Sequence, residues 1–119
     1  QLRTHPLRGR LFENLIVVEV MKHFLNRGRR PHLYFYRDSN GNEVDLLLQS
    51  GRQWVPVEIK SAATVKPDLF KGLFRFMDVV PDAVDPMLVY DGDNERRQSG
   101  VHVLYLQRLA DALSQRFEA

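Results

Sequence analysis

The sequence predicts an α/β (α+β) domain in which a mixed sheet of about five strands is flanked by helices, in the order αβββαββα. Three observations indicate this class. Apolar residues recur at helical spacing near both ends of the chain. Three strand-like segments follow one another with only short turns between them. A further helical segment then separates these three from two later strands.

Three segments carry helical signals. Residues 9–27 place apolar side chains on one helical face, and Gly28 suits a C-terminal cap. A second helix is expected to begin at Pro67 and to end before Pro81, because proline suits a first turn but cannot continue a helix. Residues 107–117 form the third, with large apolar residues at intervals of four.

Five segments are expected to be strands: 32–37, 43–49, 54–60, 87–90 and 101–106. The turn-forming sequence at 38–42 connects the first strand to the second, and Ser50-Gly51 connects the second to the third. Because these connections are short, the first three strands are predicted to form an antiparallel meander. Residues 91–100 are expected to be a polar loop.

The composition indicates one globular domain over residues 1–119. No apolar run approaches the roughly 20 residues of a membrane-spanning helix, and the N-terminal residues lack the apolar core of a signal peptide. No membrane partner is therefore expected. The absence of cysteine excludes disulfides and thiolate metal sites, and it makes a reducing cytoplasm the default compartment.

Basic and aromatic residues give weaker indications of a partner. The formal net charge of +2 is too small to identify a polyanion ligand. Phosphate contacts are nevertheless conceivable at several basic groups, namely Arg3, Arg8 and Arg10, residues 27–30, Lys71 with Arg75, and Arg96-Arg97. Trp54 and the aromatic run 34–36 are able to stack on bases. An ordinary solvated surface explains each basic group at least as well and is the default for Lys71 and Arg75, and aromatic residues on strands more often serve core or sheet packing.

The candidate chemistry lies on the second and third strands. Side chains two residues apart on a strand share a face, so Glu58 and Lys60 lie side by side. If these strands pair through the turn at 50–51, Asp45 lies across from Glu58 or diagonal to it, within roughly 4.5–8 Å. Two carboxylates at this separation repel unless a proton or a hard divalent cation relieves them. The pattern therefore predicts a Mg²⁺ or Mn²⁺ site.

Three further groups complete the expected site. Lys60 would orient or deprotonate a metal-bound water, and the backbone carbonyl of Ile59 would be an additional ligand. Glu13 falls on the face of the first helix that is predicted to be buried, where a carboxylate needs a metal or a lysine as partner. From the strand pattern alone, a surface ion-pair ladder on an exposed sheet face is an equally good interpretation.

Three segments together resemble a known family. They are Gly9-Arg-Leu-Phe-Glu-Asn14, Tyr34-Phe-Tyr-Arg-Asp38 with Gly41-Asn-Glu-Val-Asp45, and Val57-Glu-Ile-Lys-Ser61. They resemble the C-terminal domain of unknown function of archaeal and bacterial AAA-type ATPases, which is assigned to the PD-(D/E)XK nuclease superfamily. The resemblance implies a restriction-endonuclease-like fold and a nuclease-type metal site at Glu13, Asp45, Glu58 and Lys60. It departs at Val44, where the superfamily name has proline.

The main hypothesis is a metal-dependent nuclease that forms the C-terminal part of a longer ATPase chain. Its expected partners are nucleic acid, DNA before RNA, and the AAA ATPase domain of the same chain. The alternative is a non-catalytic module that binds nucleic acid, docks on the ATPase or forms a homodimer, and a hydrolase of another phosphoester is a third option. These alternatives stay open because a fold does not fix a function. The sequence has no Gly-x-x-x-x-Gly-Lys-Ser/Thr phosphate loop, so this chain alone is not expected to hydrolyse ATP.

Overall fold

The computed structural model describes residues 6–117, so the ends of the expected domain, 1–5 and 118–119, lie outside the described residues. The elements are α1 (Pro6–Leu25), β1 (Leu33–Arg37), β2 (Glu43–Ser50), β3 (Gln53–Lys60), the 3-10 turn η2 (Pro67–Phe70), α2 (Lys71–Val79), β4 (Met87–Tyr90), β5 (Arg96–Gln98), β6 (Val101–Tyr105) and α3 (Leu106–Phe117). The predicted α/β class and the order of its elements are confirmed, with one further strand, β5.

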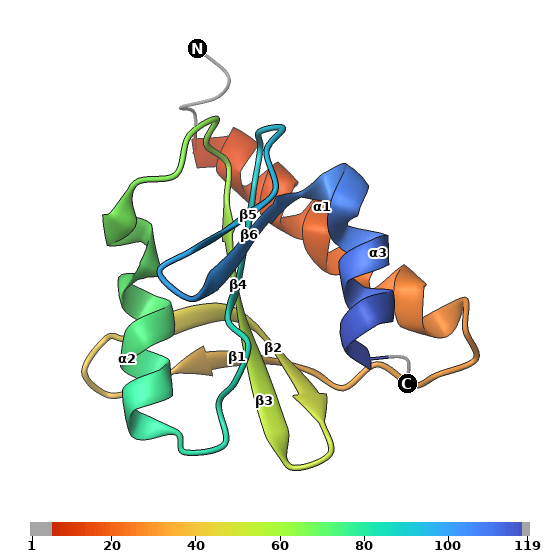
Figure 1. Cartoon of the computed structure of the whole chain (residues 1–119), viewed down its shortest axis with the longest axis horizontal. Coiled ribbons are helices and arrows are strands. Elements are labelled where there is room, and N and C mark those ends of the chain that lie inside the picture. Colours follow the sequence, from red (N-terminus) through yellow and green to blue (C-terminus); the bar gives the residue numbers. More distant parts are fainter. Residues whose placement is uncertain (1–5, 118–119) are drawn as a thin grey trace.

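The six strands form one mixed sheet in the order β1-β2-β3-β4-β6-β5 (Figure 1). β1, β2 and β3 make the predicted antiparallel meander. β4 lies parallel to β3, and β6 lies parallel to β4, while β5 pairs antiparallel with β6 at the far edge. The chain reaches β4 through η2 and α2, which is the helical crossover that a parallel pair requires.

Helices cover both faces of this sheet, with α1 and α3 on one side and α2 on the other (Figure 1). The core under α1 and α3 includes Ile16, Leu46, Val57, Val89 and Leu113. The core under α2 includes Val44, Phe70, Leu73, Leu88 and Val103. All four residues of β4 are buried, as expected for a central strand that is covered on both faces.

The first helix starts earlier than predicted and ends at Leu25 rather than at residue 27, although the predicted glycine cap is present. It begins at Pro6 rather than Gly9, because proline is well suited to a first turn and the glycine that follows is tolerated. At the other end Gly28 has a φ of +69°. The Gly28 N–H donates to the Leu25 carbonyl at 3.0 Å, and the Arg29 N–H donates to the Phe24 carbonyl at 2.9 Å. This is the Schellman arrangement, and it confirms Gly28 as the cap.

The expectation of a polar loop over 91–100 is wrong for its second half, where β5 pairs with β6. Ser99 and Gly100 join these strands, and both have positive φ, +52° and +82°. A two-residue turn with positive φ at both positions matches the twist of a hairpin. The charged side chains of β5 concealed the strand, and the Ser99-Gly100 pair was the signal available for it.

Helix α2 packs very closely on the beginning of β2. A Cβ atom added to Gly72 would lie 2.8 Å from the carbonyl oxygen of Glu43. Glycine therefore sets how near α2 comes to the strand that carries Asp45. Among the described residues, no helix has the length and apolar character needed to cross a membrane.

We expect Gly72→Ala to lower the free energy of unfolding by about 1–3 kcal/mol, because α2 must move away from β2 to admit the methyl group. Urea denaturation followed by circular dichroism measures the change. Gly9→Ala is the matched control, since the added Cβ meets nothing within 4 Å and a helical alanine gains roughly 0.5–1 kcal/mol. Equal effects of the two substitutions would contradict the close packing at Gly72.

Candidate functional site

The site begins at an irregularity between β1 and β2. Their pairing changes register between Tyr34 and Tyr36. As a result, Asp45 and Leu46 of β2 together lie opposite a single residue of β1, Phe35. Such a bulge bends the strand and redirects a side chain, so Asp45 leaves the regular alternation of β2 at this point.

The Asp45 carboxylate is bound to the main chain of β3. Its Oδ2 accepts a hydrogen bond from the Ile59 N–H at 2.8 Å. The regular β2–β3 pairing ends at Leu46 with Val57, which is the residue after Asp45 on β2 and two residues before Ile59 on β3. Asp45 therefore satisfies a β3 donor at the point where the ladder stops, and this bond fixes its orientation. Ile59 was predicted to contribute its carbonyl, whereas the contact that the structure gives it with Asp45 uses its N–H.

Asp45 and Glu58 form a hydrogen-bonded pair of carboxyl groups. Burial raises the pKa of Glu58 to about 8, and the negative charge of Asp45 and the hydrogen bond to it act in the same direction. Burial also raises the pKa of Asp45, against the opposing effect of the Ile59 N–H. Near neutral pH, Glu58 is thus protonated and donates to the Asp45 carboxylate. The structure thus places Asp45 and Glu58 next to each other, as the strand pattern predicted.

Lys60 follows at the exposed end of β3. Its charge lowers the pKa of both Asp45 and Glu58, although in neither case is it the largest influence. The cation is therefore close enough to act on the pair without neutralising it. The hydroxyl of the next residue, Ser61, is buried and has no hydrogen-bond partner among the described residues. A buried polar atom of this kind costs about 1–3 kcal/mol.

Glu13, on α1, lies near the same carboxyl groups. It is only partly buried, whereas the sequence predicted that it would be buried in the core. Burial raises its pKa, followed by the negative charges of Asp45 and Glu43. Glu43 also raises the pKa of Asp45. Sequence reasoning assigned Glu43 no role, although its position two residues before Asp45 was a usable signal.

An open cavity of about 280 Å³ lies beside Asp45. Its lining consists of Glu13, Phe35, Tyr36, Arg37, Glu43, Val44 and Asp45. Carboxylates from α1 and β2 thus meet in one hollow next to Phe35 of the edge strand. Within residues 6–117, however, no three or more His, Asp and Glu side chains are grouped so that they could hold a metal ion. The well-formed part of the predicted set is therefore the Asp45–Glu58 pair.

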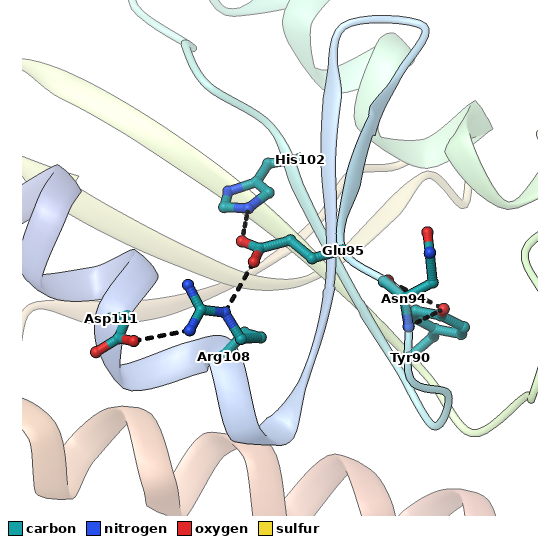
Figure 2. Close-up of polar contacts among 6 residues, drawn as sticks. All are labelled: Tyr90, Asn94, Glu95, His102, Arg108 and Asp111. Carbon is teal, nitrogen blue, oxygen red and sulfur yellow. Dashed lines mark hydrogen bonds and ion pairs between the residues drawn. The ribbon is translucent and has the colours of Figure 1, made fainter.

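A second polar cluster lies on the β5–β6 side of the molecule, away from the predicted residues (Figure 2). Glu95 contacts His102 Nε2 at 2.7 Å and accepts a hydrogen bond from Arg108 Nε at 2.8 Å. Arg108 also donates to Asp111 at 2.9 Å. The hydrogen bond to His102, then that to Arg108, lowers the pKa of Glu95. The charged groups of this cluster are paired with one another, so we interpret the cluster as a structural contact that joins the β5–β6 hairpin to α3.

A cavity of about 250 Å³ lies near this second cluster, but it contains none of the predicted site residues. Arg116, which lines it, donates to Asp85 at 2.7 Å and to Gln53 at 3.0 Å. The cavity therefore lacks the unbalanced carboxylates found beside Asp45. We take the smaller charge imbalance here as the reason to place the candidate site at β2 and β3.

The basic groups singled out in the sequence are partly engaged within the molecule. Arg8 binds Asp91 at 2.7 Å, and Arg29 donates to the Phe117 carbonyl at 2.7 Å. Arg75 donates to Asn42, close to the start of β2, at 2.9 Å. Arg3 lies outside the described residues. Of these groups, Arg75 is the one that the structure ties to the turn leading into the site.

The family comparison agrees with the extent of this fold. A family model described as "Domain of unknown function (DUF4143)" matches residues 8–109. The chain belongs to the DUF4143 family. The matched part of this DUF4143 domain runs from the first helix into the last and includes every predicted site residue. A search of the curated proteins found no match.

We expect the stability of the DUF4143 domain to fall as the pH rises from about 4.5 to about 8, relative to Glu58→Gln. The folded chain keeps the Glu58 proton over this range, whereas the unfolded chain has lost it. A raised pKa therefore stabilises the fold at low pH, and this contribution is lost as the pH rises through the folded value. Urea denaturation in a chelating buffer at several pH values measures the slope, which is at most about 1.4 kcal/mol per pH unit.

Glu19→Gln on α1 is the control for this experiment and should keep the wild-type slope, because Glu19 is not part of the pair. If wild type and Glu58→Gln have the same pH dependence, Glu58 is already ionised at neutral pH.

Proposed function

We propose that this DUF4143 domain hydrolyses phosphodiester bonds of nucleic acid, using Mg²⁺ or Mn²⁺ held by Asp45 and Glu58, with Lys60 next to the attacking water. One observation carries the proposal: two largely buried carboxyl groups are hydrogen-bonded to each other on adjacent strands, with a lysine two residues further along. The repulsion between the two carboxyl groups is relieved either by one proton or by a bound cation, and Asp45 faces an open cavity through which a cation can enter.

The residues present fit a hard divalent cation. The pair avoids repulsion by keeping one proton, and a cation would relieve the same repulsion without it. Mg²⁺ is commonly held by one or two carboxylates, with water and substrate phosphate as the other ligands, so two carboxylates are sufficient. When bound, the cation would lower the pKa of a water and neutralise charge on the phosphodiester. The Ile59 carbonyl is an additional ligand we propose. Glu13 is not grouped with the pair closely enough to share an ion in this structure, so it would become a further ligand only by moving toward the bound cation.

The remaining residues act on position and charge. The Ile59 N–H donates to one oxygen of Asp45 and so holds the carboxylate in one orientation. The carboxylate therefore loses little conformational freedom when its other oxygen binds a cation. Lys60 is exposed at the end of β3, where its ammonium group can donate a hydrogen bond to a phosphate oxygen or to the oxygen of the attacking water. Glu13 and Glu43 add negative charge, which favours a cation over an anion in the cavity.

Two finer assignments belong to the same proposal. We assign the domain to the PD-(D/E)XK nuclease superfamily and regard it as the cytoplasmic effector of an AAA-type ATPase in the same chain. The support is the sequence resemblance, together with the helix-then-three-strand arrangement that holds Glu13, Asp45, Glu58 and Lys60.

A second candidate function, a docking module without catalysis, is favoured by a different observation. Helix α1 exposes a row of large apolar residues on the face opposite its buried one: Leu11 at 56%, Leu15 at 42%, Val18 at 45% and Leu25 at 56%. Contiguous exposed apolar surface of this kind is typical of protein contacts. Docking and catalysis use different sides of α1, and the titration described next separates a domain with metal chemistry from one without it.

We expect Mn²⁺ titration by calorimetry to show one saturable site in the wild-type domain and binding at least tenfold weaker in Asp45→Asn. The substitution removes a charged ligand but keeps the size of the side chain. Asp93→Asn, in the exposed loop before β5, is the matched control and should bind as the wild type does. No binding at millimolar Mn²⁺ would overturn the metal proposal and leave the docking module.

We expect Lys60→Ala to keep Mn²⁺ binding and to lower the rate of oligonucleotide cleavage by about 10²–10⁴, the usual range for removal of a group that assists proton transfer. Cleavage of end-labelled DNA is followed on denaturing gels, in parallel with the calorimetric titration. Lys22→Ala, an exposed lysine paired with Glu19 on α1, should cleave at the wild-type rate. Unchanged cleavage by Lys60→Ala would remove Lys60 from the mechanism.

A further inference from the structure

Phe35 is unusual among the apolar residues of this domain. Its exposure is 76%, the highest of the exposed large hydrophobic side chains within residues 6–117. Burying a phenylalanine typically stabilises a protein, and at this position the fold forgoes that gain. A single exposed aromatic residue is common on protein surfaces and indicates nothing by itself. The surroundings of Phe35, however, indicate a role for it.

The two neighbours of Phe35 show what the aromatic run does elsewhere. Tyr34 makes an edge-to-face contact with Trp54, with 5.4 Å between ring centroids. Tyr36 does the same with Phe76 at 4.8 Å. Both tyrosines therefore serve sheet packing. No ring contact involving Phe35 is found among the described residues, so its aromatic faces are open.

The bulge places Phe35 beside the carboxylates. Phe35 lies opposite Asp45 and Leu46, the two residues of the bulge. It also lines the 280 Å³ cavity together with Glu13 and Asp45. β1 is an edge strand, so one side of this cavity is open to an approaching chain. An aromatic surface and two of the proposed metal ligands, Glu13 and Asp45, thus share one hollow.

The charges in the cavity restrict what can lie on Phe35. Glu13, Glu43 and Asp45 line it, against one cation, Arg37, which is already ion-paired with Glu43. A phosphate is repelled there unless a metal ion is bound. The uncharged face of a base meets no such repulsion, and every base has a face that stacks on an aromatic ring. Bases inside a duplex are stacked on one another and do not present this face.

We propose that Phe35 is a stacking platform for an unpaired base next to the scissile phosphate, so that the substrate is single-stranded or frayed nucleic acid. The inference rests on the proposed function, which it deepens by naming the substrate class. The stacked base would hold the strand against the edge of the sheet, while the phosphate beside it reaches the metal between Asp45 and Glu58.

The test is fluorescence anisotropy with an end-labelled single-stranded oligonucleotide and with a hairpin-capped duplex of the same sequence. Ca²⁺ replaces Mn²⁺ so that cleavage does not disturb binding. The proteins are the wild-type domain, Phe35→Ala, Phe35→Tyr and Val79→Ala. Val79 is the matched control, because its side chain is 64% exposed and lies at the end of α2.

Phe35→Ala is expected to weaken single-strand binding by about 5- to 150-fold, the range given by the loss of one base–aromatic stack. Phe35→Tyr and Val79→Ala should match the wild type, and weak duplex binding should not change. Mn²⁺ calorimetry on each variant is the parallel measurement, and Phe35→Ala should bind the ion as the wild type does.

Two other outcomes separate this inference from the proposed function. If Phe35→Ala binds the single strand as the wild type does, or weakens duplex binding equally, stacking on Phe35 is overturned, and intact Mn²⁺ binding leaves the metal proposal standing. If the wild-type domain binds neither Mn²⁺ nor the single strand, the proposed function fails and the stacking inference fails with it.

Discussion

The hydrogen bond from the Ile59 N–H to the Asp45 carboxylate is the contact on which the candidate site depends. The bulge opposite Phe35 takes Asp45 out of the ladder, and the side chain then binds the main chain of β3 in place of a backbone acceptor. Once Asp45 is fixed there, Glu58 meets a carboxylate at close range and keeps its own proton. The strand geometry and the burial of the two carboxyl groups are thus the reason why the pair needs a proton or a cation to relieve its repulsion.

Rigid support reaches the pair from both faces of the sheet. The core under α1 and α3 holds Val57 and Ile59 on either side of Glu58 in sequence, while α2 presses on β2 through Gly72. Side chains on well-packed strands keep their positions better than side chains on loops, which suits groups that must stay close despite their repulsion. Bringing two carboxyl groups together costs free energy through their repulsion and their loss of hydration. The packing offsets this unfavourable free energy, and the proton on Glu58 makes it smaller.

The fold was largely predictable because its local signals agree with its topology. Alternation predicted the shared face of Val55, Val57 and Ile59, and turn residues predicted the meander. The site was predictable only as a neighbourhood. Alternation cannot show a bulge, so the bond from Ile59 to Asp45 was missed, and Glu13 was placed too deep because helical periodicity gives a face and not a depth. The sequence did not distinguish Phe35 from Tyr34 and Tyr36. The strand register shows that Phe35 lies opposite the bulge, whereas its tyrosine neighbours pack on the sheet.

The position of β4 has a consequence for how the chain acquires its shape. β4 lies between β3 and β6, so the meander can form from neighbouring segments while the edge of β3 still waits for a strand that comes after α2. Until then β3 offers unpaired backbone groups and apolar side chains, the usual conditions for chains to join edge to edge. Glu58 and Lys60, at the end of that temporary edge, place charge where a wrong partner would pair. The residues assigned to the chemistry would therefore also protect the chain against aggregation while it folds.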